Sequence, residues 1–473
     1  MGKYMNLQKK DALMIGVLLS GAFLTVLNLT LMTPALPTIM VEMGVDQTTV
    51  QWLTSAYSMT EAIVVPLAAF LMGRFSTRQL FIFGMALFTA GSLVAAFAPI
   101  FALVLLGRIM QAAATGYMMT MVFSVILLIF PPEKRGMGMG MVGLVIGVAP
   151  AIGPVLSGLL VDHMGWRTIF VIVSILAAAI IVLAAVALQN YDKIRKSKFD
   201  LLSVVLSSVG LFSLLYGIST FSSAKNHLIT AAMIVVGVVV MGLYCKRQLT
   251  LDDPMLNIRI LKTFRYRMAV IYVLIMQAIC VGLETLMPLY IQGVLGHSAT
   301  VSGVTLLPGA ILSAIAALVG GRLYDVMGAR KPMILASVAL IAGGYIMYIL
   351  GVDSSVIWVG AAYAVFNVGY SLASNPINTW GINSLSNDDV PDSQSVQGTL
   401  NQVAAAFGVA LLVSISAAAS NAFVSSGAVA SAAETTFYGY HIAFIAVAVV
   451  IIVEVLLTIV FVHDKKKGSK AAE

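Results

Sequence analysis

Charged residues are scarce in this chain of 473 residues. Asp, Glu, Lys and Arg make up 10% of it, hydrophobic residues make up 60%, and the mean hydropathy is +0.99. No water-soluble globular domain has this balance. The apolar segments are long and continuous rather than short and alternating, which excludes a transmembrane β-barrel. The sequence therefore predicts an all-α polytopic protein that lies in a lipid bilayer.

Cysteine and histidine are sparse as well. Cys245 and Cys280 are too few for a disulfide framework, and the five histidines have no metal-ligand spacing. No phosphate-binding GxxxxGK[ST] loop is present, so we expect no metal, no cofactor and no ATP-driven step. The net charge of +7 is not gathered into an aromatic-interleaved patch, which argues against a nucleic-acid partner.

Apolar segments bounded by charged or turn-rich stretches predict 14 transmembrane helices. They cover residues 11–33, 49–72, 78–98, 100–124, 137–161, 167–188, 201–221, 226–245, 268–292, 301–322, 331–351, 355–384, 394–419 and 437–462. The first apolar segment is too long for a cleaved signal peptide, and no small-residue cleavage site ends it, so we expect it to remain as a signal anchor.

Lysine and arginine set the predicted topology. With the N-terminus in the cytoplasm, all of the 27 basic residues except Arg108, Arg167 and Lys225 fall in cytoplasmic segments. Both termini are therefore predicted to be cytoplasmic, in a multi-pass protein of the cell (plasma) membrane.

A weak internal repeat divides the chain. The loop Gly321–Lys331, after the tenth predicted helix, is partly matched by Ala69–Arg78, after the second. This predicts an N-terminal six-helix bundle at 1–190, an inserted helix pair with its linkers at 191–266, and a C-terminal six-helix bundle at 267–473. Parallel halves around a cavity at the bilayer midplane are typical of transporters.

The stretch from Gly143 to Gly158, GLVIGVAPAIGPVLSG, is unusual for a membrane helix because it is rich in glycine and proline. Such residues are tolerated in lipid where neighbouring helices pack closely. We interpret it as a bent helix at the junction of two moving halves; a packing helix without a moving role is the alternative. The residues of this conformational seam are Gly143, Gly147, Pro150, Gly153, Pro154 and Gly158.

Three ionisable residues, Glu61, Arg108 and Glu284, lie well inside predicted helices, and each needs a partner, a cavity or a neutral state. Counted from the helix ends at about 1.5 Å per residue, Glu61 lies about 18 Å deep and Arg108 about 12 Å deep. We therefore expect them to be near one another, with Glu61 exchanging a proton under the influence of Arg108; a static buried pair is the alternative. Glu284 is a second proton site, the countercharge for a cationic substrate, or a permanently neutral acid. Glu454 is expected near the cytoplasmic end in a packing or snorkelling role.

Uncharged polar residues predict a mostly apolar substrate cavity with scattered hydrogen-bonding groups. Interhelical packing is the alternative for each of them. In the loop after the tenth helix, Asp325 is expected to pair with a loop arginine or a helix end and to latch one conformation. The cavity residues are Asn28, Tyr57, Gln111, Gln277, Asn367, Asn375 and Asn378, with Tyr363, Phe366 and Tyr370 beside them, and the cytoplasmic latch is Gly321, Asp325, Gly328 and Arg330.

Several of these motifs resemble those of the major facilitator superfamily. Gly321–Lys331 resembles its GxLxDxxGxRK loop, Leu27–Pro37 its first-helix signature, Gly107–Gln111 its fourth-helix element, Gly147–Gly158 its fifth-helix antiporter motif and Gly165–Phe170 its GWRxxF element. Thr379–Asn383 and Gly398–Gln402 are similar to a late region of lincomycin-resistance LmrB-like exporters, which belong to the 14-helix drug:proton antiporters of the EmrB/QacA type. Two positions depart from the family pattern: Asn28 replaces the first-helix acid, and Gly73 replaces the usual loop aspartate.

The resemblance implies a major facilitator fold with two six-helix bundles and two inserted helices. It also implies export of amphipathic drugs or antibiotics by alternating access, driven by the proton gradient, from a protein that we expect to be monomeric. A dedicated exporter of an endogenous metabolite, lipid or peptide is the alternative. A membrane-embedded enzyme or a channel is disfavoured, because no catalytic constellation is present and the glycine-proline seam and the buried acids favour a transporter.

Overall fold

The computed structural model describes residues 9–190, 200–221, 227–426 and 431–463, and every regular element among them is helical. The long helices of the first part of the chain are α1 (Lys9–Met43), α3 (Trp52–Val64), α5 (Thr77–Ala96), α6 (Phe101–Ile129), α7 (Arg135–Met164) and α8 (Arg167–Ala187). They are followed by α9 (Leu201–Thr220), α10 (His227–Thr250), α11 (Phe264–Gly293), α12 (Ala299–Met327), α13 (Arg330–Ile349), α14 (Val356–Ile382), α15 (Val390–Ser425) and α16 (Ala432–Phe461). Shorter elements are α2 (Gln47–Val50), α4 (Ala68–Arg74), η1 (Val65–Leu67), η2 (Pro132–Lys134), η3 (Ile258–Lys262) and η4 (Asn387–Asp389).

Within the described residues, 13 stretches are long and apolar enough to cross a membrane. To these α7 adds a helix of 30 residues whose sequence is uncharged from Gly136 to Val161. The expectation of an all-α polytopic fold is confirmed. The second predicted helix is interrupted: α3 passes through η1 into α4, because Pro66 lacks the amide hydrogen that an uninterrupted α-helix would use.

The helices form two groups, each with a hydrophobic core of its own. One core runs from Met14 to Leu188 and joins α1 to α8, and the other runs from Ala269 to Val462 and joins α11 to α16. We call these groups the N half and the C half. The inserted helices α9 and α10 pack on each other, and α9 also contacts α3 of the N half and α15 of the C half.

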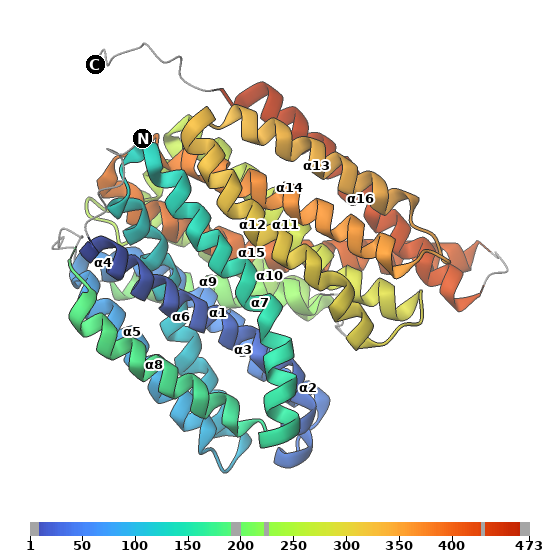
Figure 1. Cartoon of the computed structure of the whole chain (residues 1–473), viewed down its shortest axis with the longest axis horizontal. Coiled ribbons are helices and arrows are strands. Elements are labelled where there is room, and N and C mark those ends of the chain that lie inside the picture. Colours follow the sequence, from blue (N-terminus) through green and yellow to red (C-terminus); the bar gives the residue numbers. More distant parts are fainter. Residues whose placement is uncertain (1–8, 191–199, 222–226, 427–430, 464–473) are drawn as a thin grey trace.

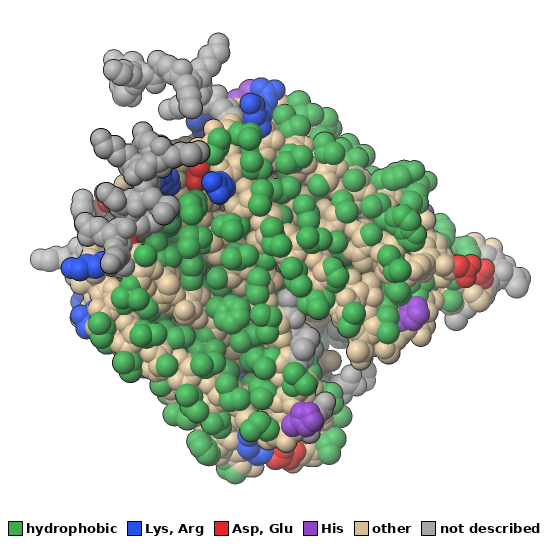
Figure 2. Space-filling view, in the orientation of Figure 1, with side chains coloured by type: hydrophobic (Ala, Val, Ile, Leu, Met, Phe, Trp, Pro, Cys, Tyr) green, Lys and Arg blue, Asp and Glu red, His purple; other side chains and the backbone are tan. Residues whose placement is uncertain are grey.

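The two halves meet at one end of the molecule and diverge toward the other (Figure 1). We call the end where they meet the basic end, because α7, α11 and α13 begin there with Arg135, Arg265, Arg267, Arg330 and Lys331. Most of the Lys and Arg side chains visible in Figure 2 gather at this end. The long flanks between the two ends are covered by apolar side chains, as a lipid-facing surface requires.

A third, smaller apolar cluster joins the halves at the basic end. It includes Leu127 and Met139 of the N half and Tyr266, Ile382 and Val396 of the C half. All of these side chains are at most 4% exposed. The basic end is therefore closed by packed side chains in this conformation.

Candidate functional site

The guanidinium of Arg108 on α6 is the buried centre of a polar cluster in the N half. It is 0% exposed. Its Nε donates to the carbonyl of Leu53 at 3.3 Å, and one terminal nitrogen donates to Gln111 Oε1 at 3.0 Å and to the carbonyl of Asn28 at 3.5 Å. The guanidinium also lies over the Tyr57 ring, 4.2 Å from its centroid, while the second terminal nitrogen has no partner. These contacts hold α1, α3 and α6 together around a charge that pairs with no carboxylate of the described residues.

The neighbouring polar side chains complete this cluster with hydrogen bonds to one another. Asn28 Nδ2 donates to Gln111 Oε1 at 3.2 Å, and Gln111 Nε2 donates to Ser92 Oγ at 2.7 Å. The hydroxyls of Tyr57 and Thr115 are 2.7 Å apart. Asn28, Tyr57 and Gln111 are each at most 1% exposed, so in this conformation their side chains are packed inside the N half.

Glu61 does not pair with Arg108, which corrects the expected contact between them. Helices α3 and α6 run in the same direction, and their contacts fix the register: Arg108 bonds to Leu53, whereas Gly116 packs against the backbone of Glu61. Glu61 is therefore level with Gly116, eight residues or about 12 Å farther along α6 than Arg108. A Cβ at Gly116 would lie 2.7 Å from the Glu61 carbonyl oxygen, so only glycine allows this close approach.

The side chain of Glu61 is half-buried, and among the described residues its carboxylate has no hydrogen-bond or ion-pair partner. It lies one helical turn after Tyr57 on the same face of α3. Gly398 of α15 packs against Val65 of η1, so the region just beyond Glu61 is where the C half touches this helix. Glu61 therefore lies close to the junction of the two halves.

Glu284 belongs to a polar seam between α11 and α14 in the C half. Cys280 Sγ lies 3.8 Å from Glu284 Oε1 and 4.0 Å from Asn367 Oδ1, and the Tyr370 hydroxyl donates to Gln277 Oε1 at 2.7 Å. Gln277, Cys280 and Glu284 occur at spacings of three and four residues, which places them on one face of α11. The Glu284 side chain is exposed, although it lies beside the buried Cys280 and Asn367.

The other candidate cavity residues are distributed differently. Asn375 Nδ2 donates to the carbonyl of Ala317 at 3.1 Å and packs against Gly143, so it joins α14 to α12 and α7. Asn378 is 8% exposed, and Phe366 is fully buried in the C-half core. Sequence reasoning missed Ser92, Thr115 and Cys280; of these, Thr115 and Cys280 lie one helical turn from Gln111 and Glu284, and that spacing was the only available signal.

The glycine-rich helix α7 packs on α12 of the C half over its first four turns. A Cβ at Gly147 would lie 2.8 Å from the Ala314 Cβ, one at Gly143 would lie 2.8 Å from the Ala317 Cβ, and one at Gly140 would lie 2.9 Å from the Leu318 Cα. These glycines recur at spacings of three and four residues and form one face of the helix. The backbones of α7 and α12 therefore approach more closely than residues larger than glycine would permit at these positions.

Beyond Gly147 the helix α7 leaves the C half. Gly153 packs instead against Thr30 of α1, and at Gly158 a Cβ would meet no described atom within 4 Å. Gly158 thus takes no part in the contact between the halves, which corrects the expected extent of the seam. Pro150 is half-buried, and the Pro154 side chain lies outside the described residues.

Asp325 lies at the basic end against the N-terminus of α7. Its two carboxylate oxygens accept hydrogen bonds from the backbone amides of Gly136, at 2.9 Å, and Met137, at 2.7 Å. An anion at this position interacts favourably with the unpaired amides and the dipole of the helix. A Cβ at Gly321, one turn earlier on α12, would overlap the carbonyl oxygen of Gly136, so this contact depends on glycine.

Two further features support this latch. Arg135 donates to Asn383 Oδ1 at 3.0 Å and to Asn387 Oδ1 at 2.5 Å, so α7 is bound to the end of α14 as well. Gly328 ends α12 with a φ of 80°, a left-handed conformation that favours glycine, and Arg330 begins α13 immediately afterwards.

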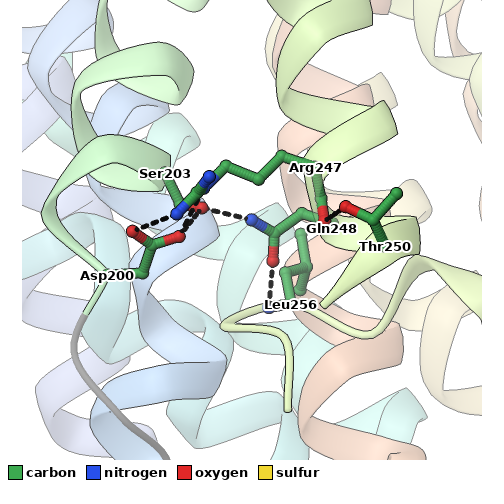
Figure 3. A network of polar contacts seen from close by, with 6 residues as sticks. All are labelled: Asp200, Ser203, Arg247, Gln248, Thr250 and Leu256. Carbon is green, nitrogen blue, oxygen red and sulfur yellow. Dashed lines mark hydrogen bonds and ion pairs between the residues drawn. The ribbon is translucent and has the colours of Figure 1, made fainter. Parts of the chain in front are cut away.

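The inserted helices are fastened to each other at the basic end by a polar network (Figure 3). Arg247 donates from Nε and from one terminal nitrogen to the two carboxylate oxygens of Asp200, at 2.7 and 3.0 Å. Gln248 Nε2 donates to Ser203 Oγ at 2.6 Å, and its Oε1 accepts from the Leu256 amide at 3.2 Å. The network orients the linker that leaves α10 and reaches α15, where the Asn257 amide donates to Asp392 at 2.9 Å.

Glu454 on α16 is 0% exposed, and neither of its carboxylate oxygens has a partner among the described residues. Of the expected packing or snorkelling role, burial excludes snorkelling and leaves packing. Counting residues to the end of the helix gives the depth of a side chain but not its direction, and this side chain points into the C half.

Comparison with known proteins shows what the chain is similar to. The model of the Major Facilitator Superfamily matches residues 18–409. The MFS-type transporter YcnB of Bacillus subtilis is 37% identical over 98% of this chain and 96% of its own length, and the lincomycin resistance protein LmrB of the same species is 35% identical over 87% of each. A multidrug resistance protein B homologue of Mycobacterium tuberculosis is 25% identical over 84% of this chain and 74% of its own. Among solved structures, the human organic anion transporter MFSD10 superposes with a TM-score of 0.66 at 13% identity and covers 94% of this chain and 99% of its own.

Proposed function

The chain belongs to the major facilitator superfamily, and we propose that it exports amphipathic small molecules in exchange for protons by alternating access. It is a multi-span membrane transporter and not an enzyme. We assign the basic end to the cytoplasm by the positive-inside rule, with both termini on that side of the cell membrane and a single chain as the working unit. In this orientation the conformation described here is closed toward the cytoplasm.

The observation that carries the proposal is the pair of carboxylates in two halves that touch at one end. Glu61 lies beside the junction in the N half, and Glu284 lies at an exposed position in the polar seam between α11 and α14 of the C half. A carboxylate at membrane depth is stable when it carries a proton or when water or a cation reaches it. Opening and closing of the space around it therefore changes its protonation, which is the requirement for coupling transport to a proton gradient.

The polar seam around Glu284 supports an amphipathic substrate. Gln277, Asn367 and Tyr370 provide amide and hydroxyl groups among apolar neighbours, and Glu284 provides one negative charge. Lincomycin resistance in a relative with 35% identity is consistent with substrates of this type. We propose that Glu284 faces the positive charge of cationic substrates and that Arg108 stabilises the N half without exchanging protons with Glu61.

The test uses purified protein in proteoliposomes with an imposed proton gradient. Glu61→Gln and Glu284→Gln should each abolish uphill transport of lincosamides or cationic dyes, and Glu284→Gln should weaken cationic substrates more than neutral ones. Glu434→Gln is the matched control, because Glu434 is exposed at the start of α16 and glutamine preserves its capping role. Uphill transport that persists in both Glu61→Gln and Glu284→Gln would refute proton coupling through these residues. Transport of a single endogenous compound and of no drug would favour a dedicated exporter.

A further inference from the structure

A second group of buried oxygens lies away from Glu61 and Glu284, between α11 and α16. Glu454 and Thr458 of α16 are 0% and 1% exposed, and Tyr272 of α11 is 3% exposed. Neither oxygen of Glu454 has a hydrogen-bond partner among the described residues, and the hydroxyls of Tyr272 and Thr458 lie beside each other without a well-formed hydrogen bond. Buried polar groups normally find partners, so an incompletely paired set of this size requires an explanation.

Helix geometry brings the three side chains to the same place. Tyr272 and Tyr290 are 18 residues apart on α11, as are Tyr440 and Thr458 on α16, and 18 residues make five turns at about 3.6 residues per turn. Each pair therefore shares one face of its helix. The rings of Tyr290 and Tyr440 are in contact, with centroids 6.0 Å apart, so these two faces oppose each other.

The two helices stay together along this face. They run in opposite directions, and their ends at the basic end are joined by Phe264 and Phe461, whose ring centroids are 6.0 Å apart. Five turns closer to the basic end, Tyr272 and Thr458 therefore face each other as Tyr290 and Tyr440 do. Glu454 precedes Thr458 by one turn and lies on the same side of α16.

Among the described residues, no positive side chain contacts this group. The arginines at the start of α11 lie over aromatic rings elsewhere, Arg265 over Trp380 and Arg267 over Phe264. At the level of Glu454, α13 contributes Ser337, which donates to its own helix, and α15 contributes the uncharged Gln402. The remaining charged or titratable residues of the described parts of α11, α13, α15 and α16 lie at least five residues from this level; apart from tyrosines they are Cys280, Glu284, Arg330, Lys331, Asp392, Glu434 and His441.

We propose that Glu454, Thr458 and Tyr272 form a binding site for one monovalent cation, a sodium ion or a proton. The donor set consists only of oxygens, which suits a hard cation. One carboxylate supplies a single negative charge, so a monovalent ion neutralises it, whereas a divalent ion would leave an unbalanced charge in an apolar core. Binding joins α16 to α11, the helix that carries Glu284.

The site is independent of the proposed transport reaction, so it is tested without substrate. Thermal unfolding of the purified protein is followed in detergent while NaCl replaces choline chloride at constant ionic strength, and in a second series the pH is varied from about 6 to about 9 without sodium. A ligand that binds only the folded state raises the melting temperature as its concentration rises above Kd, here by about 2–4 °C. A response to sodium identifies a sodium site, and a melting temperature that falls as the pH rises identifies a proton site.

Variants separate this site from the rest of the molecule. Glu454→Gln should remove the response to either cation, and Tyr272→Phe and Thr458→Val should each shift its midpoint at least about tenfold to higher concentration, because each removes one oxygen without reducing the bulk of the side chain much. Glu434→Gln on the same helix should leave the response unchanged. A melting temperature in the parent protein that depends on neither sodium nor pH would overturn the proposal, as would a response that survives in Glu454→Gln.

Discussion

The contact between α7 and α12 makes a quantitative prediction about the conformational equilibrium. Gly321→Ala introduces a Cβ that overlaps the carbonyl oxygen of Gly136, lies 2.8 Å from its carbonyl carbon and lies 3.1 Å from the Gly140 nitrogen. All three atoms belong to the backbone, so no side-chain rotation relieves the overlap. The helices must move apart at the basic end.

The magnitude follows from two contributions. Overpacking of this kind costs about 1–3 kcal/mol. Separation of the helices also lengthens the two hydrogen bonds from the α7 amides to Asp325, and a hydrogen bond to a charged group contributes about 1.5–3 kcal/mol. A combined loss of at least about 2 kcal/mol shifts the equilibrium away from the state closed at the basic end by about 30-fold.

The shift can be measured as a distance between spin labels at the opposite ends of the same helices. Leu159 of α7 and Val304 of α12 are 57% and 64% exposed, and cysteines at these positions accept labels in a protein whose native cysteines have been replaced by serine. In the state closed at the basic end the labels are far apart, since α7 leaves α12 beyond Gly147. Gly321→Ala should increase the population with a short distance between the labels.

Gly158→Ala is the matched control because it makes the same substitution on α7 where a Cβ meets no described atom within 4 Å. It should leave the distance distribution of the parent protein unchanged. The reasoning is refuted if Gly321→Ala and Gly158→Ala give the same distribution while both proteins remain folded.

Two further predictions concern residues that hold the helices together. Hydrogen bonds from Arg247 lower the pKa of Asp200 to about 2, so the contribution of this carboxylate to stability is complete above its unfolded pKa of about 4 and is lost only as the pH falls through about 2. Thermal unfolding of Asp200→Asn should therefore differ from that of the parent by a constant amount between about pH 5 and 8, of at most about 1 kcal/mol, and a pH-dependent difference in this range would contradict the ion pair. Arg108→Lys should destabilise the protein by about 2–4 kcal/mol, because a lysine cannot bond to Leu53 and to Gln111 at once, whereas Arg74→Lys at an exposed position should have no measurable effect on the melting temperature.

The helices were predictable because a chain in lipid must satisfy its backbone hydrogen bonds within each helix. The contacts between helices depend on how far one helix is shifted along its neighbour, and a single sequence does not give that shift. Glu61 and Arg108 illustrate the difference. Their depths, counted from the ends of the predicted helices, differ by only about 6 Å. The bond from Arg108 to Leu53 and the packing of Gly116 on Glu61 fix an offset that separates them by about twice that distance. Ordinary errors of a few residues in predicted helix ends are enough to create a false pair.

The glycines of α7 indicated that this helix packs closely on another helix. They did not indicate at which residue the contact with α12 ends. Gly143 and Gly147 contact α12, whereas Gly153 contacts α1 and Gly158 contacts neither helix. All four occur in one apolar run with similar neighbours, so composition treats them alike. The four glycines differ only in where they lie relative to the point at which the N half and the C half diverge, and that point depends on the packing of all the helices.

The two sides of the basic end are closed by different chemistry, and the sequence difference between the two repeats explains why. On the side of α7 and α12, Asp325 binds the N-terminus of α7 with two backbone hydrogen bonds. The loop Ala69–Arg78 occupies the equivalent place in the N half, but Gly73 stands where the acid would be. This loop therefore supplies no carboxylate to the contact on that side.

Apolar packing and the linker of the inserted pair take its place. Ala69, Leu127 and Val396 belong to the apolar cluster that joins the halves there, together with Leu256 and Ile260 from the linker. The same linker donates its Asn257 amide to Asp392 at the start of α15, and its position is fixed in turn by the network of Asp200, Ser203, Arg247 and Gln248. The inserted helices are therefore part of the closure, because α15 cannot move away from the N half at the basic end without breaking its contacts with the linker or moving the linker with it.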